Sequence, residues 1–340
     1  MSKEENLMTS MQEIADKAGV SRATVSRVLS NHPSVKADTR KKVMYWVKKM
    51  NYEPNMIAQS LAGNSTNLIG VIVPEIAYPF FSEIIEAIER QAFYEGYSIV
   101  ISNTNRKIEK EKNIIAEYKK RKVDGIIAVP VSERESVSVY KKISIPVTVI
   151  TKKINNFNSI YISHYKGGEQ IAKHFINSGF KKIGYIGPIS NSTSARKFAG
   201  FKDYLKNQGV QLTDIIECNP PKNMNATLVA ESVKEYISNK EIGSEVFFAN
   251  DDISACEAIN AFKMQGYDIP NDIKIAGFDN TLLAREMNPR LTSLAQPLEA
   301  IGKKAVQVLI NQINYHTKPH MYEMESYVVE RESTLNLNIK

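Results

Sequence analysis

Two patterns of apolar positions divide this chain. Up to about residue 52, apolar residues recur at the spacing of short helices, and no segment predicts a strand. From Leu68 onward, apolar runs of four to six residues alternate with amphipathic segments. Nearly continuous apolar strands that alternate with helices are typical of parallel sheets with helices on both faces. The sequence therefore predicts an all-α N-terminal segment followed by a larger α/β region.

The apolar runs of the α/β region are too many for one small sheet, so two lobes are expected. The predicted strands are Leu68–Val73, Ser98–Ser102, Gly125–Val129, Val147–Ile150, Ile183–Ile186, Glu245–Ala249 and Ile273–Gly277. The predicted helices between them are Phe81–Tyr94, Lys110–Arg121, Gly168–Ser178, Ala199–Asn207, Ala226–Ser238 and Ile253–Met264.

Three short helices are predicted before residue 52. Ser10 and Glu13 fit a capping box at the start of the first helix, and Gly19 suits the left-handed turn that ends it. Ser21 can cap a second helix. The apolar stripe of this second helix comprises Val25, Val28 and Leu29. A third helix is predicted from roughly Ala37 to Met50. Two short helices joined by a tight glycine turn predict a helix-turn-helix.

The second helix leaves a polar face beside its apolar stripe. A recognition helix needs such side chains to reach base edges in the major groove. Arg27 is expected to read a guanine, because its guanidinium can donate to two acceptors on that base. The residues suited to phosphate contacts, which hold register without reading sequence, are Thr24, Ser26, Thr39 and Arg40. A plain three-helix bundle with solvated arginines is the alternative.

Charge and composition agree with a nucleic-acid-binding segment. The chain has a net charge of +7, and residues 1–65 hold ten Lys or Arg against six Asp or Glu. No apolar run reaches the ~18 residues of a membrane span, and the N-terminus lacks a secretory signal. Cys218 and Cys256 are too few for a disulfide framework and lack metal-ligand spacing. A cytoplasmic protein without a membrane partner is therefore expected.

The helix-turn-helix segment is distinctive in its own right. Residues 11–31 read MQEIADKAGVSRATVSRVLSN and closely resemble the DNA-binding motif of the lactose-repressor (LacI) family. The resemblance continues through Thr39-Arg40, Asn51-Tyr52, Pro54-Asn55 and the core to Arg331–Thr334. It implies a sequence-specific transcriptional regulator, expected to be a repressor. Such a protein binds double-stranded, palindromic operator DNA as a homodimer.

The resemblance also carries individual DNA contacts. Ala23 departs from family members that have a long polar side chain at this position. With alanine here, one base is read through contact with a thymine methyl group or is not read at all. Residues 55–63 resemble the family's hinge helix, which forms on operator DNA and wedges a leucine, matched by Leu61, into the minor groove. Linker packing is the alternative role of Leu61. The predicted DNA-contacting residues are Arg22, Ala23, Thr24, Ser26, Arg27, Asn31, Thr39, Arg40, Asn55, Ala58 and Leu61.

Three parts of the chain are predicted from these observations. Residues 1–54 form the helix-turn-helix domain, residues 55–65 the hinge helix and linker, and residues 66–340 the effector-binding and dimerisation core. The fold class is thus an all-α headpiece plus a two-lobed, periplasmic-binding-protein-like α/β core. The N-lobe spans about residues 66–163 and 296–325, and the C-lobe about residues 164–295 and 326–340.

Polar and aromatic residues follow several of the predicted strands. In an open two-lobed α/β protein the ligand lies between the lobes, beyond the carboxyl ends of the strands. Carboxylates, amides, an arginine and neighbouring rings at such ends suit a polyhydroxylated ligand. The predicted effector-binding residues are Phe80, Phe81, Asn103, Asn191, Arg196, Asn250 and Asp279. Of these, the ones that match ligand-contacting positions of the family are Phe80, Phe81, Asn250 and Asp279.

One departure from the family concerns the gripping arginine. Many sugar-binding members read Ala-Arg-x-Arg-Leu-x-Gly-Phe, and residues 195–201 here read ARKFAGF. Counting back from Gly200, the position of the family's ligand-gripping arginine is occupied here by Ala195, and Arg196 stands one residue later. Either the loop is shifted by one residue or the ligand differs. The resemblance implies allosteric switching by a sugar-like small molecule. A phosphocarrier protein on the N-lobe is an alternative corepressor.

An enzyme and a secreted binding protein are the competing classes. The sequence has no GxGxxG, P-loop or GxSxG motif, and its five histidines lack HExxH spacing. A secreted binding protein would share the core, but it would carry a signal peptide and no helix-turn-helix. We therefore expect no enzymatic activity, no metal and no cofactor.

Overall fold

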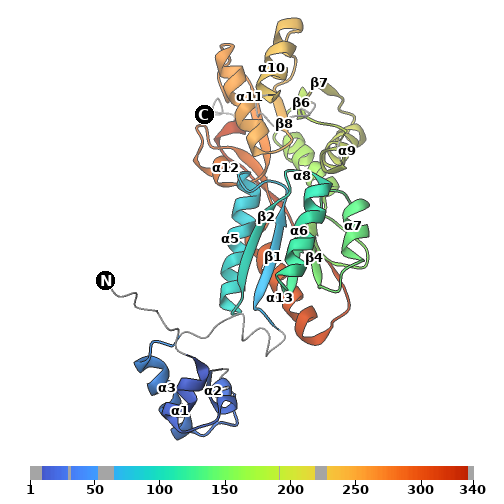
Figure 1. Ribbon diagram of the computed structural model, residues 1–340. Coiled ribbons are helices and arrows are strands. Elements are labelled where there is room, and N and C mark those ends of the chain that lie inside the picture. Colours follow the sequence, from blue (N-terminus) through green and yellow to red (C-terminus); the bar gives the residue numbers. More distant parts are fainter. Residues whose placement is uncertain (1–9, 30–31, 53–64, 191, 219–227, 336–340) are drawn as a thin grey trace, which may run out of the picture. The chain divides into compact units, whose positions relative to one another are not determined.

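The structure, a computed structural model, describes residues 10–29, 32–52, 65–190, 192–218 and 228–335 (Figure 1). The chain forms two compact units, Met1–Thr66 and Asn67–Lys340. The described part of the first unit is helical, and the second unit contains two mainly parallel sheets covered by helices. The fold class predicted from the sequence is therefore confirmed.

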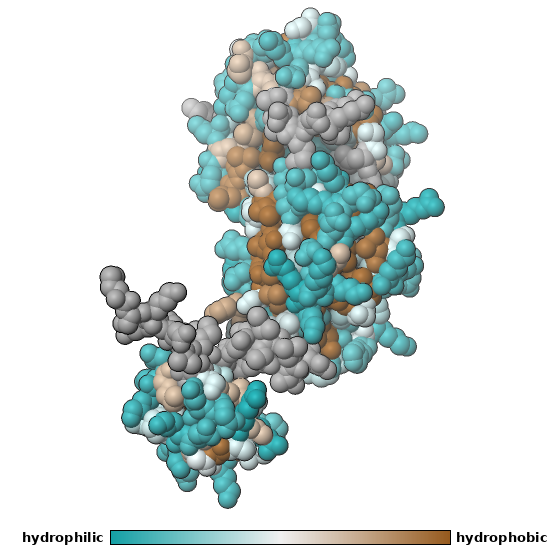
Figure 2. Space-filling view, in the orientation of Figure 1, coloured by the Kyte–Doolittle hydropathy of each residue, from teal (hydrophilic) through white to brown (hydrophobic). Residues whose placement is uncertain are grey.

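The described residues of the N-terminal unit form α1 (Met11–Ala18), α2 (Arg22–Leu29) and α3 (Ala37–Lys49). The predicted capping box is present: the Glu13 amide donates to Ser10 Oγ at 3.2 Å, and the Ser10 amide donates to Glu13 Oε2 at 2.7 Å. The buried core comprises Ile14, Ala15, Ala18, Val25, Val28 and Val43. Figure 2 shows a mainly hydrophilic visible face on this unit, as expected when its apolar stripes turn inward.

The first sheet of the core has the strand order β11-β5-β4-β3-β1-β2, and all its neighbouring strands are parallel. Its strands are β1 (Leu68–Val73), β2 (Ser98–Asn103), β3 (Gly125–Ala128), β4 (Val147–Ile150), β5 (Asn158–Ile162) and β11 (Met321–Met324). Helices α5 (Pro79–Tyr94) and α13 (Leu298–Tyr315) pack together on one face. Helices α6 (Ile108–Lys120) and α7 (Glu135–Tyr140) cover the other face. We name this part the N-lobe.

The second sheet has the order β12-β10-β9-β8-β6-β7, and only β12 is antiparallel to its neighbour. Its strands are β6 (Ile183–Gly187), β7 (Leu212–Glu217), β8 (Val246–Ala249), β9 (Lys274–Asp279), β10 (Thr292–Ala295) and β12 (Tyr327–Val329). Helices α8 (His164–Asn177) and α9 (Ser192–Asn207) cover one face. Helices α10 (Leu228–Asn239) and α11 (Asp252–Met264) cover the other, and α12 (Leu282–Glu286) follows β9. We name this part the C-lobe.

The chain passes between the two lobes at three places. It leaves the N-lobe after β5, returns after β10, and crosses again between β11 and β12. Each lobe is therefore built from two separate stretches of sequence. The carboxyl ends of β8 and β9, the start of α5 and the crossing after β10 all contribute residues to the junction between the lobes.

Helices α8 and α9 approach closely at two glycines. A Cβ atom at Gly168 would lie 2.0 Å from the carbonyl oxygen of Lys197, and one at Gly200 would lie 1.9 Å from that of Tyr165. Neither distance is sterically allowed, so only glycine permits this backbone contact. The contact lies in the second and third turns of α9, and this helix begins at Ser192 and not at Ala199 as the sequence predicts.

Within the described ranges, no helix combines the length and the apolarity that a bilayer crossing demands. The same residues contain no cluster of His, Cys, Asp and Glu side chains that could hold a metal ion.

Candidate functional site

The predicted recognition face lies on α2. Its exposed residues comprise Arg22, Ala23, Ser26 and Arg27. They lie beside the buried stripe, so the core of this unit does not cover them. Thr39, in the first turn of α3, is half-buried. The predicted contacts that fall outside the described residues are Asn31, Asn55, Ala58 and Leu61.

Two residues assigned to phosphate contacts also hold this unit together. The Thr24 amide donates to Ser21 Oγ at 3.1 Å, and their hydroxyl oxygens are 2.9 Å apart, so Thr24 fastens the turn before α2. The Arg40 guanidinium donates to the carbonyl oxygens of Val28 at 3.4 Å and His32 at 2.9 Å. Arg40 therefore satisfies backbone acceptors at the end of α2, where helix carbonyls lack intrahelical partners.

The N-lobe presents aromatic residues at the start of α5. Phe80 and Phe81 are buried and meet edge to face with ring centroids 5.1 Å apart, and the Tyr78 ring lies 5.9 Å from that of Phe81. The Tyr78 side chain faces the Asp251 carboxylate of the C-lobe. Burial and this carboxylate raise the pKa of Tyr78, so its hydroxyl stays neutral at the junction between the lobes.

Asp279 ends β9 at the lobe junction. It is buried, and its φ of 105° lies in the left-handed region that side-chain-bearing residues rarely adopt. Its Oδ1 accepts a hydrogen bond of 2.7 Å from Gln296 Nε2. Burial raises the pKa of Asp279, the Lys197 ammonium opposes that shift, and the neighbouring Asp252 carboxylate adds to it. Asp279 therefore holds its proton more strongly than an exposed carboxyl group does.

The buried cation of the junction is Lys197. Lys197 is only 4% exposed, and its Nζ donates to the Asn250 carbonyl oxygen at 2.8 Å. The same Nζ lies 3.8 Å from the centroid of the Phe278 ring. Asn250 in turn donates from Nδ2 to Asp251 Oδ2 at 2.8 Å. We name the set Tyr78, Lys197, Asn250, Asp251, Asp279 and Gln296 the interlobe site.

Two acceptors of the interlobe site have no hydrogen-bond partner in the described part of the chain. They are Asn250 Oδ1 and Gln296 Oε1, and both are buried. Buried polar atoms are nearly always hydrogen-bonded, and leaving one unpaired costs about 1–3 kcal/mol. A ligand hydroxyl that donates to either oxygen would remove that penalty.

The other predicted effector residues do not join this set. Asn103 ends β2, and its Oδ1 accepts from the Asn105 amide at 3.1 Å, as in a turn. The Arg196 side chain is 48% exposed and pairs with Glu133 of the N-lobe at 3.2 Å. Asn191 lies outside the described residues. The sequence did contain a signal for Lys197, which stands three residues before Gly200, at the second arginine of the family pattern.

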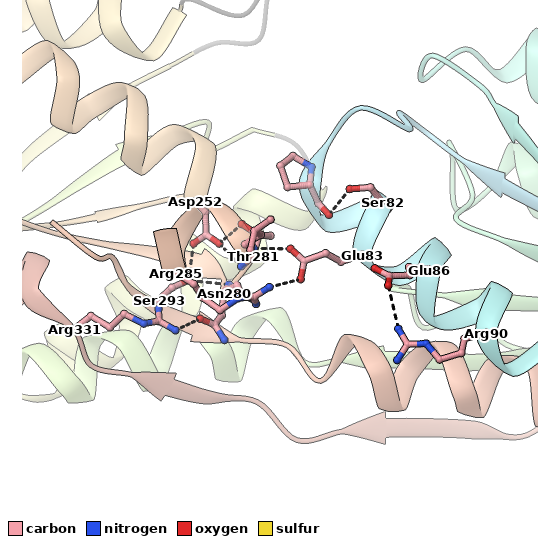
Figure 3. Close-up of polar contacts among 12 residues, drawn as sticks. Ser82, Glu83, Glu86, Arg90, Asp252, Asn280, Thr281, Arg285, Ser293 and Arg331 are labelled. Carbon is pink, nitrogen blue, oxygen red and sulfur yellow. Dashed lines mark hydrogen bonds and ion pairs between the residues drawn. The ribbon is translucent and has the colours of Figure 1, made fainter. Parts of the chain in front are cut away.

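A hydrogen-bonded network holds the loop that follows β9 (Figure 3). Asp252 Oδ2 accepts from the Thr281 amide at 2.7 Å and from its hydroxyl at 2.8 Å, while Oδ1 accepts from Ser293 Oγ at 2.6 Å. The Asn280 amide donates to Ser293 Oγ at 3.0 Å, and Asn280 Oδ1 accepts from Arg331 Nη2 at 2.6 Å. The C-lobe thus fixes this loop through both its backbone and its side chains.

Acid is expected to destabilise the core through His164. Its buried ring stacks on Phe278 with centroids 6.1 Å apart, and burial together with Lys197 lowers the pKa of His164 to about 3. The unfolded chain binds that proton near pH 6.5, so stability falls as the pH drops below this value. We expect a loss of about 1 kcal/mol in unfolding free energy between about pH 6.5 and 5.5, measured by urea titration.

The His164→Gln variant should lose this part of the pH dependence. The matched control is His320→Gln, at an exposed histidine, which should keep the slope of the parent protein. An unchanged slope in His164→Gln would contradict the assignment.

A helix-turn-helix with an exposed recognition face, carried on the same chain as a two-lobed α/β core, defines a DNA-binding transcriptional regulator with a ligand-binding type of core. Residues 10–55 match the family described as "Bacterial regulatory proteins, lacI family", and residues 172–334 match the "Periplasmic binding protein-like domain". The chain belongs to the LacI family, as the resemblance in its sequence implied, and it is a regulator of this family rather than an enzyme.

Known proteins match over most of the chain. It is 32% identical to the ribose operon repressor of Halalkalibacterium halodurans, over 96% of this chain and 97% of that protein. The Lac repressor dimer bound to operator and the anti-inducer ONPF superposes with a TM-score of 0.85 at 27% identity, over 96% and 99% of the two chains. A LacI-type protein from Alkaliphilus metalliredigens, complexed with D-xylulofuranose, has a TM-score of 0.69 at 30% identity, over 79% and 100%.

Proposed function

We propose that this protein is a repressor that binds a palindromic operator as a homodimer and responds to a small sugar-type effector held in the interlobe site. One helix-turn-helix reads one half-site, so a two-fold operator calls for two copies of the chain. The solved Lac repressor complex named above is a dimer on operator DNA, which supports the same arrangement here. Its place of action is then the cytoplasm, where the DNA is.

The observation that carries the effector proposal is the pair of unpartnered buried acceptors, Asn250 Oδ1 and Gln296 Oε1. They flank the Asp279 carboxyl group and the Lys197 ammonium, so donors and acceptors converge on one small volume. Polar groups that clasp hydroxyls suit a neutral sugar. The ribose operon repressor and the D-xylulofuranose complex among the relatives support this class.

The test is a direct binding measurement on the purified full-length protein. D-Ribose and D-xylulose are titrated by calorimetry, with lactose as a larger sugar for comparison. Operator DNA is obtained by selection from a random inverted-repeat library. We expect a pentose to bind and to change the affinity for the selected DNA. If none of these sugars binds, the sugar class of the effector is wrong; if the chain selects no inverted repeat, the operator proposal is wrong.

A neighbouring pair of cations offers a sharp test of the site. Lys197→Met is expected to weaken binding of the pentose about tenfold, because it removes a buried charged hydrogen-bond donor beside Asp279. Arg196→Met removes the same charge from the preceding residue, whose side chain is 48% exposed and pairs with Glu133, and should change the affinity less than twofold. An affinity of Lys197→Met within twofold of that of the parent would show that the ligand does not depend on Lys197.

A further inference from the structure

The segment that carries Asp279 is held from the N-lobe as well as from the C-lobe. Glu83, in the second turn of α5, accepts a hydrogen bond of 2.6 Å from the Leu282 amide and one of 3.0 Å from Arg285 Nη2 (Figure 3). Leu282 is the first residue of α12, where amides lack intrahelical partners. The N-cap residue Thr281 makes no side-chain cap bond, so a carboxylate from the opposite lobe takes the capping role.

The loop between β9 and α12 has a strained backbone. Asp279 and Asn280 have φ values of 105° and 55°, and such conformations persist only where their surroundings impose them. Arg285 connects this loop to the N-lobe, because its Nη1 donates to the Asn280 carbonyl oxygen at 2.8 Å while its Nη2 donates to Glu83. The position of this loop therefore depends on Glu83 of the N-lobe as well as on Asp252 and Ser293 of the C-lobe.

We infer that Glu83 is a positioning residue for the interlobe site: from the N-lobe, it fixes the segment 279–282 and so couples ligand contacts at Asp279 to the arrangement of the two lobes. This inference rests on the proposed function, because it takes Asp279 to be a residue that contacts the ligand. The hydrogen bonds that support this inference join residues of the core that the structure describes. A ligand that displaces the segment 279–282 must either move Glu83 or break its bonds to Leu282 and Arg285, which makes α5 the N-lobe element that responds.

The same helix provides a matched control one turn later. Glu86 has a side chain that is 72% exposed, against 23% for Glu83, and it contacts only Arg90 of its own helix, at 3.3 Å, among the residues described. A charge-assisted bond to a backbone amide is stronger than such an exposed pair. Removing Glu83 should therefore affect the loop, whereas removing Glu86 should not.

The test measures hydrogen exchange of residues 280–287 in the full-length protein without any sugar. In Glu83→Ala we expect exchange of this segment to rise about tenfold, because one charge-assisted hydrogen bond and one ion pair are lost. Glu83→Gln keeps an oxygen for the Leu282 amide but loses the charge opposite Arg285, so it should fall between Glu83→Ala and the parent. Glu86→Ala should match the parent. Arg285→Gln approaches the same contact from the C-lobe and should resemble Glu83→Gln.

Exchange in Glu83→Ala that equals the parent, or an equal rise in Glu86→Ala, overturns the inference. A second arm uses D-ribose as the probe. D-Ribose should slow hydrogen exchange of residues 280–287 in the parent protein, and it should bind Glu83→Ala several-fold more weakly than the parent. Its affinity for Glu86→Ala should equal its affinity for the parent. If D-ribose does not bind the parent, the proposed sugar class fails while the sugar-free exchange experiment still decides the role of Glu83. If D-ribose binds Glu83→Ala as tightly as the parent, the coupling is refuted.

Discussion

Gly168→Ala is expected to lower the free energy of unfolding of the core by about 3 kcal/mol, which corresponds to a melting temperature lower by roughly 5–10 °C. The added Cβ would lie 2.0 Å from the Lys197 carbonyl oxygen, an atom of the backbone that cannot turn aside. Helices α8 and α9 must then move apart and lose contact along their length. Thermal unfolding followed by circular dichroism measures the change.

The sign of this effect separates packing from helix propensity. Inside a helix, alanine is favoured over glycine by about 1 kcal/mol, so propensity alone predicts that Gly168→Ala is stabilising. Gly200→Ala places its Cβ against α8 from the other side and should destabilise in the same way. Lys173→Ala, at an exposed position of α8, is the control and should shift the melting temperature by little. A Gly168→Ala protein as stable as the parent would show that the two helices are not in close contact.

Arg27→Ala is expected to reduce discrimination between the selected operator and a variant with one guanine replaced by about 1–3 kcal/mol. Arg27 lies on the exposed face of α2, and its guanidinium has the geometry to bind two acceptors of a guanine in the major groove. Fluorescence anisotropy with both duplexes, at one fixed salt concentration, gives the ratio of the two affinities.

The control for Arg27 must remove the same charge elsewhere in the module. Lys48 is exposed near the end of α3, so Lys48→Ala should weaken binding to both duplexes alike and leave their ratio unchanged. If the ratio in Arg27→Ala equals that of the parent, Arg27 reads no base. The unfolding temperature should stay near that of the parent in both variants, because neither side chain is in the buried core.

The elements that the sequence predicted well are those with strong local patterns. The strand Leu68–Val73 is an unbroken apolar run and appears with the predicted ends, and the capping box and Gly19 gave the start and end of α1 correctly. The strand Thr292–Ala295 was not predicted, because it is short and half polar; its Thr292 and Ser293 hydroxyls bond other buried polar groups of the fold. The edge strands β11 and β12 have no continuous apolar run and depend on partners distant in sequence.

The interlobe site was predicted in part. Asp279 and Asn250 follow buried strands, and the carboxyl ends of parallel strands meet at one edge, so their proximity could be expected. Lys197 was missed because the count along the loop placed the gripping arginine at Ala195 and the neighbouring Arg196 was chosen in its place. Only the register of α9 against α8 shows which of the side chains of Arg196 and Lys197 is buried. Gln296 and Glu83 carry no local signal, since their roles arise from contacts across the lobe junction.

The three passages of the chain between the lobes also bear on the order of folding during synthesis. Helix α13 covers one face of the N-lobe sheet, and β11 completes its edge, yet both come after nearly the whole C-lobe in the sequence. The C-lobe in turn receives its edge strand β12 last of all. While the ribosome is still making the final part of the core, neither lobe can close its apolar interior, whereas the N-terminal unit already has every residue of its own core. A nascent chain of this protein would thus carry a folded headpiece ahead of two incomplete lobes, which makes chaperone binding late in translation an expected feature of its biogenesis.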